Sequence, residues 1–335
     1  MPGGLSSTCI FIQFLTNAKL SFQCARSRGD PRDRRHHRRH RCATLDVLGY
    51  VAAQVGIEAL VAALPGLDEQ PLETEQVAQL DSKDMDIEVW RALVLRARHH
   101  LARPDVAGIV VTHGTDTLEE TAYLLQRVLA PSKPLVLTAA MRPSTSLQAD
   151  GPQNLIDAVN VARVAGASGV VVVMAGWLHG ALDVRKTHTH RLDAFGCGDA
   201  GPLGRIDAGR LRRVRDWPHG VALGADVLDV DRWPRVEIVL SHAGASGAIV
   251  DALLAQGVDG IVAAGTGNGT LHHALEAALL RAKAEGVAVW RSSRVADGGV
   301  LSAADAVLPD SGPLTPVQAR VELILQLLQC RSVRA

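Results

Sequence analysis

Short, unbroken apolar runs alternate with longer segments of helical periodicity from about residue 49 to the C-terminus. The runs are apolar at consecutive positions, which is typical of strands that are buried on both faces of a sheet. The predicted strands are 108–114, 134–140, 169–176, 237–243, 259–265 and 287–293. This alternation predicts an α/β fold with a mostly parallel sheet, in which ligands bind at the carboxyl ends of the strands.

The segments between these strands carry apolar residues three and four positions apart, as amphipathic helices do. The predicted helices are 117–129, 150–166 and 270–286. Thr117 and Glu120 have the spacing of a capping box, which favours a helix that begins there. Thr315 and Pro316 form a cap and a first-turn proline, so a last helix is expected from there to about Gln329.

The chain of 335 residues is long enough for two domains. The polar region 198–236, rich in Gly, Arg and Asp, is the best candidate for the boundary between them. We therefore expect an N-terminal domain over 44–215, a linker over 216–236 and a smaller C-terminal domain over 237–335. Residues 1–43 do not fit this pattern and are expected to be an aberrant basic segment, disordered or translated in the wrong frame.

Charge is distributed unevenly along the chain. Basic and acidic residues number 35 each, but residues 1–43 hold nine basic and two acidic ones, which leaves 26 basic and 33 acidic residues elsewhere. An acidic body has no general affinity for phosphate backbones, so no nucleic-acid partner is expected. No apolar run is long enough to span a bilayer, and the first 23 residues lack the pattern of a signal peptide, so no membrane partner is expected.

Cysteine usage favours a reducing compartment. Cys197 and Cys330 are the only cysteines after residue 43, which excludes a disulfide framework. We expect a cytoplasmic protein, and a periplasmic location stays open if residues 1–48 are not the true N-terminus.

The most informative segment is VVTHGTDTLEE, in which a buried strand ends at Thr112 and a short turn leads directly into a helix. Such turns place side chains and free backbone N–H groups at the mouth of a sheet. The hydroxyl of Thr115 beside the carboxylate of Asp116 can serve there as nucleophile and positioning group. The competing interpretation is that Thr115, Asp116 and Thr117 only cap the helix, and spacing alone does not decide between the two.

The string DVRKTHTH contains a second candidate. Lys186 is the only lysine between Lys133 and Lys283, so it is not part of a lysine-rich surface. A buried lysine near a threonine hydroxyl can act as its base. The competing interpretation, a lysine on a surface hairpin, is favoured by the residues alone.

Two further motifs are weak. His188 and His190 alternate, so a strand would present both to one face, but two histidines alone rarely make a metal site. The string AAGTGNG fits neither the phosphate-loop pattern nor the dinucleotide-binding pattern, and we interpret it as a tight strand-to-helix turn.

Seven motifs together resemble those of the bacterial-type L-asparaginase family, which includes the glutaminase-asparaginases. In chain order they are GYVAAQVGIEALVAALPGL, DSKDM, VVTHGTDTLEETAYLL, AAMRPSTSLQADGPQNLIDAV, DVRKTHT, GIVAAGTGNGT and RSSRV. The resemblance runs from Gly49 to near the C-terminus. It implies a larger flavodoxin-like N-terminal α/β domain, a smaller C-terminal α/β domain and, as a rule, a homotetramer built as a dimer of dimers.

The resemblance also implies a reaction. Members of this family hydrolyse the side-chain amide of L-asparagine, and some also that of L-glutamine, without a metal or cofactor. By motif, Thr115, Asp116 and Lys186 match the Thr-Asp-Lys triad of the family, and Asp116 also holds the α-amino group of the substrate. Gly114 belongs to the same turn and is counted with the substrate-binding residues.

Further binding residues follow from the same resemblance. Ser82 matches the residue that binds the substrate α-carboxylate, Ala140 matches the backbone carbonyl that meets the amide, and Tyr50 matches the tyrosine of the mobile lid. Lys83 stands where the family often has glutamine, which puts one contact with the α-amino group in question. The asparagine that a dimer partner contributes in the family falls at Thr270.

One family motif is missing. Members open with a strand followed by TGGTIA, whose second threonine is the nucleophile, and that place holds RDRRHHRRHRCA here. Read one base out of frame, the codons of Asp30 to Cys42 can encode Ile-Leu-Gly-Thr-Gly-Gly-Thr-Ile-Ala-Gly-Thr-Ala-Ala, and the two codons before them can encode two valines. We hypothesise that the segment is this motif translated in the wrong frame, with the nucleophile at the position of His36.

On this hypothesis a chain with the present sequence has lost the first strand and is inactive or nearly so, whereas a frame-corrected chain is active. The alternatives are an asparaginase-like subunit of a tRNA-dependent amidotransferase, a non-catalytic amino-acid-binding relative, and a nucleic-acid-binding protein that uses the basic arm. A zinc site fits less well, because the His and Cys residues at 36, 37, 40 and 42 have no common zinc spacing.

Overall fold

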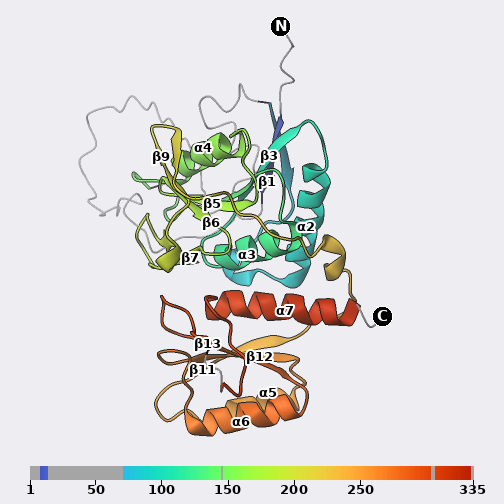
Figure 1. The fold of residues 1–335 in the computed structure, drawn as a ribbon. Helices are drawn as coiled ribbons and strands as arrows, with labels where there is room; N and C mark the ends of the chain where they lie inside the picture. The colour runs from blue at the N-terminus through green and yellow to red at the C-terminus, as the bar shows by residue number, and fades with distance from the viewer. Residues whose placement is uncertain (1–7, 14–70, 145, 303–305, 333–335) are drawn as a thin grey trace, which may run out of the picture.

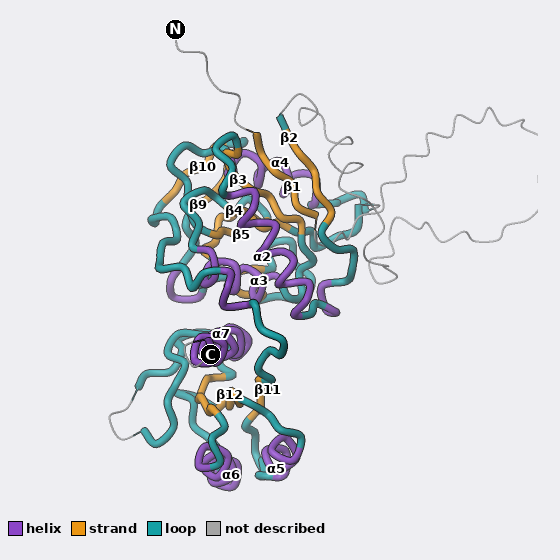
Figure 2. Tube along the Cα trace, turned by 90° about the vertical axis from the view of Figure 1, so that its right-hand side faces the viewer, coloured by secondary structure: helices purple, strands orange, loops and turns teal. Residues whose placement is uncertain are grey.

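The computed structural model describes residues 8–13, 71–144, 146–302 and 306–332, which form two α/β bodies one above the other (Figure 1). The upper body holds the larger sheet. In the turned view of Figure 2 the helix α7 (Pro316–Ser332) is seen end-on between the two bodies. The predicted fold class, a larger mostly parallel sheet domain with a smaller C-terminal α/β domain, is confirmed.

The larger sheet has eight strands in the order β10-β9-β6-β5-β4-β3-β1-β2. Pairing from β2 through β5 is parallel, and pairing from β5 through β6, β9 and β10 is antiparallel. The strands are β1 (Thr8–Gln13), β2 (Leu72–Gln76), β3 (Val106–Thr112), β4 (Leu135–Thr138), β5 (Val170–Met174), β6 (Trp177–Gly180), β9 (Gly204–Asp207) and β10 (Arg210–Arg213).

Helices cover both faces of this sheet, which is why β3 to β5 are apolar at nearly every position. On one face lie α2 (Ile87–Leu101) and α3 (Leu118–Leu129), and on the other lies α4 (Gly151–Ala162). The first of these begins at a side-chain cap, because the carboxylate of Asp86 accepts the N–H of Val89 at 2.8 Å.

The C-terminal body is a three-stranded parallel sheet in the order β11-β12-β13. Two helices cover one face and α7 covers the other (Figure 1). The elements are β11 (Val236–Leu240), α5 (Ala248–Ala255), β12 (Gly260–Gly265), α6 (His273–Ala284) and β13 (Ala288–Ser293).

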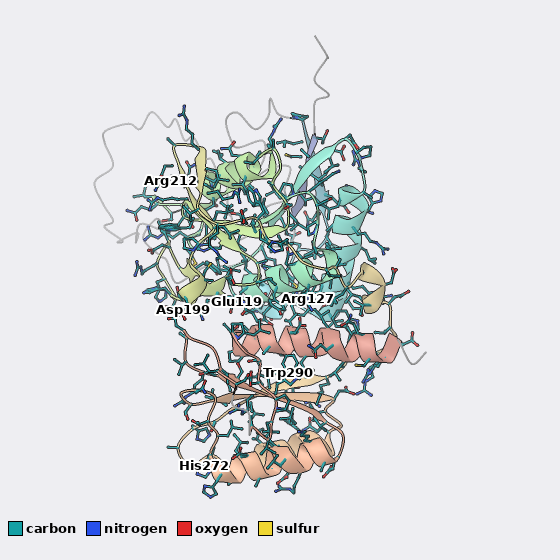
Figure 3. The ribbon with its side chains drawn as sticks, viewed as in Figure 1. Glu119, Arg127, Asp199, Arg212, His272 and Trp290 are labelled. Atoms are coloured by element: carbon teal, nitrogen blue, oxygen red, sulfur yellow. The ribbon has the colours of Figure 1, made fainter. Side chains whose placement is uncertain are left out.

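The helix α7 also packs against α3 of the larger body. Its Glu322 accepts two hydrogen bonds from Arg127, at 2.7 and 2.9 Å, and one from the hydroxyl of Tyr123 at 3.1 Å. Figure 3 shows Arg127 and Glu119 on the side of the larger body that faces α7, and Trp290 on the far side of that helix. The packing of α7 on α3 and the ion pair between Arg127 and Glu322 therefore connect the two bodies.

Each predicted strand and helix overlaps an element of the structure. The helix expected from Thr117 begins there, with Thr117 in the N-cap position, so its predicted start is confirmed. The side chain of Thr117 makes no capping bond to this helix, and its hydroxyl donates to the carbonyl of Ser82 at 2.8 Å. The predicted cap at Thr315 is confirmed, since its Oγ1 accepts the N–H of Gln318 at 3.3 Å.

The N-terminal segment supplies a strand that the sequence analysis did not predict. Thr8–Gln13 lies between β3 and β2, parallel to both, and Gln13 pairs with Thr112. Cys9 and Ile10 are fully buried, and burial raises the pKa of the Cys9 thiol to about 11, so the thiol is an uncharged core group. This strand differs from the expectation that residues 1–43 are disordered and that the sheet lacks its first strand.

Candidate active site

A buried histidine shapes the turn that follows β3. The Nδ1–H of His113 donates to the carbonyl of Gly114 at 2.7 Å, because a carbonyl can only accept, and Nε2 therefore accepts from the hydroxyl of Thr121 at 2.9 Å. Burial lowers the pKa of His113 to about 4, against the opposing effect of the Gly114 carbonyl. The ring is thus neutral at pH 7 and fixes the backbone just before Thr115.

Ser82 packs directly against this turn. It lies in a short 3₁₀ helix, η2 (Ser82–Asp84), is 2% exposed, and its Oγ accepts the N–H of Asp116 at 3.2 Å. A Cβ atom added at Gly114 would lie only 2.4 Å from that Oγ, so the close approach requires glycine. Because the oxygen accepts from Asp116, the hydroxyl hydrogen is left to donate to an anionic group.

Lys186 joins the two groups that follow Gly114. It lies on β7 (Arg185–Lys186), and its Nζ is 2.9 Å from the hydroxyl of Thr115 and 2.7 Å from Oδ1 of Asp116. Thr115 is buried, whereas the side chain of Asp116 is 52% exposed. Thr115 and Asp116 therefore make contacts beyond the capping of a helix, and Lys186 is a partly buried lysine whose Nζ bridges a buried hydroxyl and an open carboxylate.

Glu119 is a site residue that the sequence analysis missed. One of its carboxylate oxygens accepts the backbone N–H of Lys186 at 2.8 Å. Burial raises the pKa of Glu119 to about 7, although the bond from Lys186 opposes this shift. The only sequence signal is its position four residues after Thr115, in the first turn of the predicted helix.

The loop after β4 brings Ala140 to the same edge of the sheet. The buried Asn154 donates to the carbonyl of Ala139 at 2.9 Å, and the carboxylate of Asp150 accepts the N–H of Met141 at 2.9 Å. The peptide groups on either side of Ala140 are thereby held by α4 and its cap position. Asn154 and Asp150 were not predicted, because their partners are identified only once the chain is folded.

The structure describes only some of the other predicted residues. Tyr50 and the position of His36 fall outside the described residues. Lys83 is exposed and pairs with Asp84, next in the chain. Thr270 lies in the C-terminal body, where its hydroxyl donates at 2.9 Å to a carbonyl in the tight turn after β12. That turn was predicted from AAGTGNG, and the prediction is confirmed.

The two histidines after Lys186 do not lie on a strand. Nδ1 of His188 accepts the N–H groups of His190 and Arg191, at 3.0 and 3.1 Å, which makes it the cap of a turn. Within the described residues no three His, Cys, Asp or Glu side chains gather as metal ligands would. The helices of the same residues also lack the length and apolarity needed to cross a bilayer.

A cavity of about 590 Å³ lies between the two bodies, but it is not the space around Thr115. Its walls include Tyr123, Arg127, Arg185, Trp290 and Glu322. Neither Thr115, Asp116 nor Lys186 lines it. The cluster of Thr115, Asp116 and Lys186 instead reaches solvent through the exposed side chain of Asp116, at the carboxyl edge of the larger sheet.

Comparison with known families agrees with this geometry. Residues 44–218 match the family described as asparaginase, N-terminal, and residues 235–334 match the glutaminase/asparaginase C-terminal domain. The chain belongs to the asparaginase family. Asparaginase-type amidohydrolase is therefore its functional class, as the sequence motifs indicated.

Several asparaginases resemble the chain over most of its length. It is 40% identical to L-asparaginase 2 of Escherichia coli (strain K12), over 84% of this chain and 83% of that protein. It is 38% identical to the glutaminase-asparaginase of Pseudomonas fluorescens biotype A, over 75% and 70% respectively. The structure is similar to the crystal structure of a probable cytoplasmic L-asparaginase from Campylobacter jejuni, with a TM-score of 0.84, 33% identity and coverage of 96% and 95%.

Proposed function

We propose that this chain carries the site for hydrolysis of L-asparagine to L-aspartate and ammonia, with Thr115, Asp116 and Lys186 as catalytic residues. The observation that supports this most is the bridge from Lys186 Nζ to the Thr115 hydroxyl at 2.9 Å and to Asp116 at 2.7 Å. When its amine is neutral, Lys186 can accept a proton relayed through the Thr115 hydroxyl, and it can later return that proton to the departing ammonia.

The surrounding groups suit a free amino acid. The open carboxylate of Asp116 can bind the substrate ammonium group, and the hydroxyl of Ser82 can donate to the substrate carboxylate. The carbonyl of Ala140 can accept from the side-chain amide. Tyr50 is proposed as the lid residue by its motif alone. L-Glutamine is the proposed second substrate, in keeping with relatives named glutaminase-asparaginase.

The reaction in this family begins at a threonine of the TGGTIA motif, which this sequence does not contain. We therefore propose, as a separate point, that residues 30–42 are out of frame and that the chain with this sequence is inactive or nearly so. The frame-corrected chain carries TGGTIA, with its nucleophile at position 36. A threonine hydroxyl there would lose its proton and attack the amide carbon, and backbone N–H groups would stabilise the resulting oxyanion. The C–N bond would then break as the nitrogen takes up a proton and leaves as ammonia, and water would hydrolyse the threonine ester to release L-aspartate.

Two chains test both proposals: the present one, and one in which residues 28–42 carry the frame-corrected residues. Ammonia release from L-asparagine is measured for each. Activity of the corrected chain alone supports both proposals. Activity of both chains overturns the frame proposal, and inactivity of both folded chains overturns the assignment of the substrate. The codons for residues 25–50 in the source DNA give an independent answer on the frame.

The role of Lys186 is tested in the active chain by Lys186→Met. Loss of a group that transfers protons lowers kcat by about 10²- to 10⁴-fold. Lys283→Met is the matched control, because Lys283 bonds a carbonyl in the C-terminal body and should keep the full rate. Equal rates for the two variants would contradict the assignment.

The oligomeric state follows as a proposal from the same family membership. We propose a homotetramer, and light scattering should then give four times the chain mass of 35.5 kDa. A monomer mass would overturn this proposal.

The cytoplasmic location stays a prediction, because relatives include one named cytoplasmic and one named periplasmic. The amidotransferase-subunit and non-catalytic alternatives gain no support from the described residues or from the named relatives.

A further inference from the structure

Lys186 sits on an unusually small element. The strand β7 has two residues and forms a two-stranded sheet with β8 (Phe195–Gly196). Two residue pairs give little rigidity to a side chain that must hold contacts of 2.7 and 2.9 Å with two different groups. Other contacts must therefore fix the position of Lys186.

Besides the contacts of the Lys186 side chain, contacts from three other segments of the chain reach this strand. The carbonyl of Val184, just before it, accepts from Gln318 of α7 at 3.1 Å. The guanidinium of Arg185 donates to Asp297 of the C-terminal body at 2.6 Å. The N–H of Lys186 itself donates to Glu119 of α3 at 2.8 Å. Of the three contacts, the one with Glu119 acts directly on the lysine.

Glu119 follows closely in the sequence after Thr115 and Asp116, the two residues that the Lys186 side chain contacts. Thr115 and Asp116 immediately precede α3, and Glu119 is in its first turn. The lysine is thus held at its ammonium end by Thr115 and Asp116 and at its backbone end by Glu119. A bond from an N–H to a carboxylate is about twice as strong as one to a neutral acceptor.

We propose that Glu119 is a positioning residue for Lys186, whose carboxylate holds the β7 backbone so that Nζ meets Thr115 and Asp116. This inference rests on the proposed function, because that function gives Lys186 the proton transfers. Glu119 itself touches no reacting atom and acts through the lysine.

The burial of Glu119 makes this contact sensitive to pH, and the charges around it modify the effect. Glu120 lies beside it on α3, Arg185 and Lys186 face it from β7, and Arg320 of α7 lies 3.8 Å from Glu120. Burial is the main cause that raises the pKa of Glu119 to about 7. Below that pH the carboxyl becomes neutral, and its bond to Lys186 weakens because it loses the contribution of the negative charge.

Three variants separate the role of the contact from that of the charge. Glu119→Ala removes the acceptor, and Glu119→Gln keeps an amide oxygen that can accept the N–H of Lys186 but does not titrate. Glu120→Gln is the matched control, because Glu120 is a partly buried neighbour with a raised pKa that faces α7 instead of β7. The three changes thus alter the same helix turn with different effects on β7.

The first measurement does not depend on activity. Hydrogen exchange of the Lys186 amide, followed by mass spectrometry of a peptide that covers 184–187, is compared between variants at the same pH. Loss of protection is expected in Glu119→Ala, with most protection kept in Glu119→Gln and full protection in Glu120→Gln. Equal protection in all three variants would overturn the proposal, whether or not the protein hydrolyses L-asparagine.

The second measurement uses the chain that hydrolyses L-asparagine. Misplacement of a catalytic group by about 1 Å can lower kcat about 100-fold, so Glu119→Ala should lose between about 10- and 100-fold in kcat with a small change in KM. Glu119→Gln should recover most of kcat and lose the inflection near pH 7. An equal loss in Glu119→Ala and Glu120→Gln would show general damage to α3 and overturn the positioning role. Normal kcat in Glu119→Ala with lost protection would overturn the role of Lys186 instead.

Discussion

Gln13 of β1 lies beside Thr112 of β3 in parallel register, so both strands end at the sheet edge where the Thr115 turn begins. One strand position exists between β2 and β3, and Thr8–Gln13 occupies it. The frame-corrected sequence contains a second candidate for that position, the apolar run just before TGGTIA. The two segments therefore compete for one place in the sheet.

Ile10→Ala tests whether the sheet depends on β1. Ile10 is fully buried in the core, so its truncation should lower the free energy of unfolding by about 2–5 kcal/mol. Chemical denaturation measures this loss. Ile249→Ala is the control, because Ile249 is 51% exposed and should lose no more than about 0.5 kcal/mol. Equal stabilities of the two variants would mean that residues 8–13 are not part of the folded sheet.

The same substitution should behave differently in the frame-corrected chain. The restored strand is followed directly by the glycine turn, so it should take the place of β1 and leave Ile10 outside the core. Ile10→Ala should then change the unfolding free energy by no more than about 0.5 kcal/mol. A large loss in the corrected chain would show that Thr8–Gln13 keeps its place even when the motif is restored.

Gly114→Ala should damage substrate binding. Its Cβ would meet Ser82 Oγ at 2.4 Å, so the serine must move away from the position in which it can donate to the substrate carboxylate. In the chain that hydrolyses L-asparagine, we expect KM to rise at least about tenfold, because that corresponds to the loss of one hydrogen bond to a charged group. Gly180→Ala is the control, since its nearest atom would lie at 3.4 Å, an ordinary contact. An unchanged KM in Gly114→Ala would remove Ser82 from the binding site.

His113 should contribute to acid unfolding. Its pKa is lowered from 6.5 to about 4 in the folded protein, so the unfolded chain binds a proton below about pH 6.5 while the folded chain does not. Stability therefore falls as the pH drops from 6.5 towards 4. In His113→Gln this component is absent, so the unfolding free energy should fall less over that window. His219→Gln, at an exposed site, should keep the wild-type pH dependence, and the same dependence in both variants would contradict the prediction.

Arg185 and Asp297 should be coupled across the two bodies. The guanidinium is 14% exposed and the carboxylate 63% exposed, so the pair is partly shielded from solvent. A double-mutant cycle with alanine at each position should give a coupling of about 1 kcal/mol in the unfolding free energy. The pair Arg191 and Asp193 is the comparison, being closer to full exposure at 61% and 44%, and should couple less. Equal couplings would mean that the contact between bodies adds no stability.

Much of the fold could be predicted because its strands are buried on both faces. The runs that became β3 to β5 and β11 to β13 carry their signal in consecutive apolar residues. In contrast, β10 reads Arg-Leu-Arg-Arg and offers a single apolar residue, so nothing local marks it as a strand. It forms because β9 supplies an antiparallel partner and Leu211 packs against the apolar cluster on the α4 side of the sheet.

The unpredicted β1 has a different explanation. Its apolar residues continue through Phe14 and Leu15, so a strand-like run was present in the sequence. The run precedes the basic segment, lies outside the strand–helix alternation that begins near residue 49, and lacks the pattern of a signal peptide. Length alone would have favoured a strand, because the run is too short for a membrane span.

The site was predictable only in part. Thr115 and Asp116 stand out because they follow a strand and open a helix, whereas Lys186 depends on resemblance to a family. Its bond to Thr115 joins residues 71 positions apart, which no local pattern encodes. The contact of Glu119 with the Lys186 backbone is of the same kind and becomes visible only in the folded chain.

The last strand of the larger sheet has one more consequence. An edge strand presents unpaired N–H and C=O groups to which another chain can add, and long apolar edges are a common start of aggregation. The strand β10 is short and places three arginines, Arg210, Arg212 and Arg213, along this edge, all exposed. A strand from a second molecule would have to approach that line of positive charge, so this end of the sheet resists uncontrolled extension.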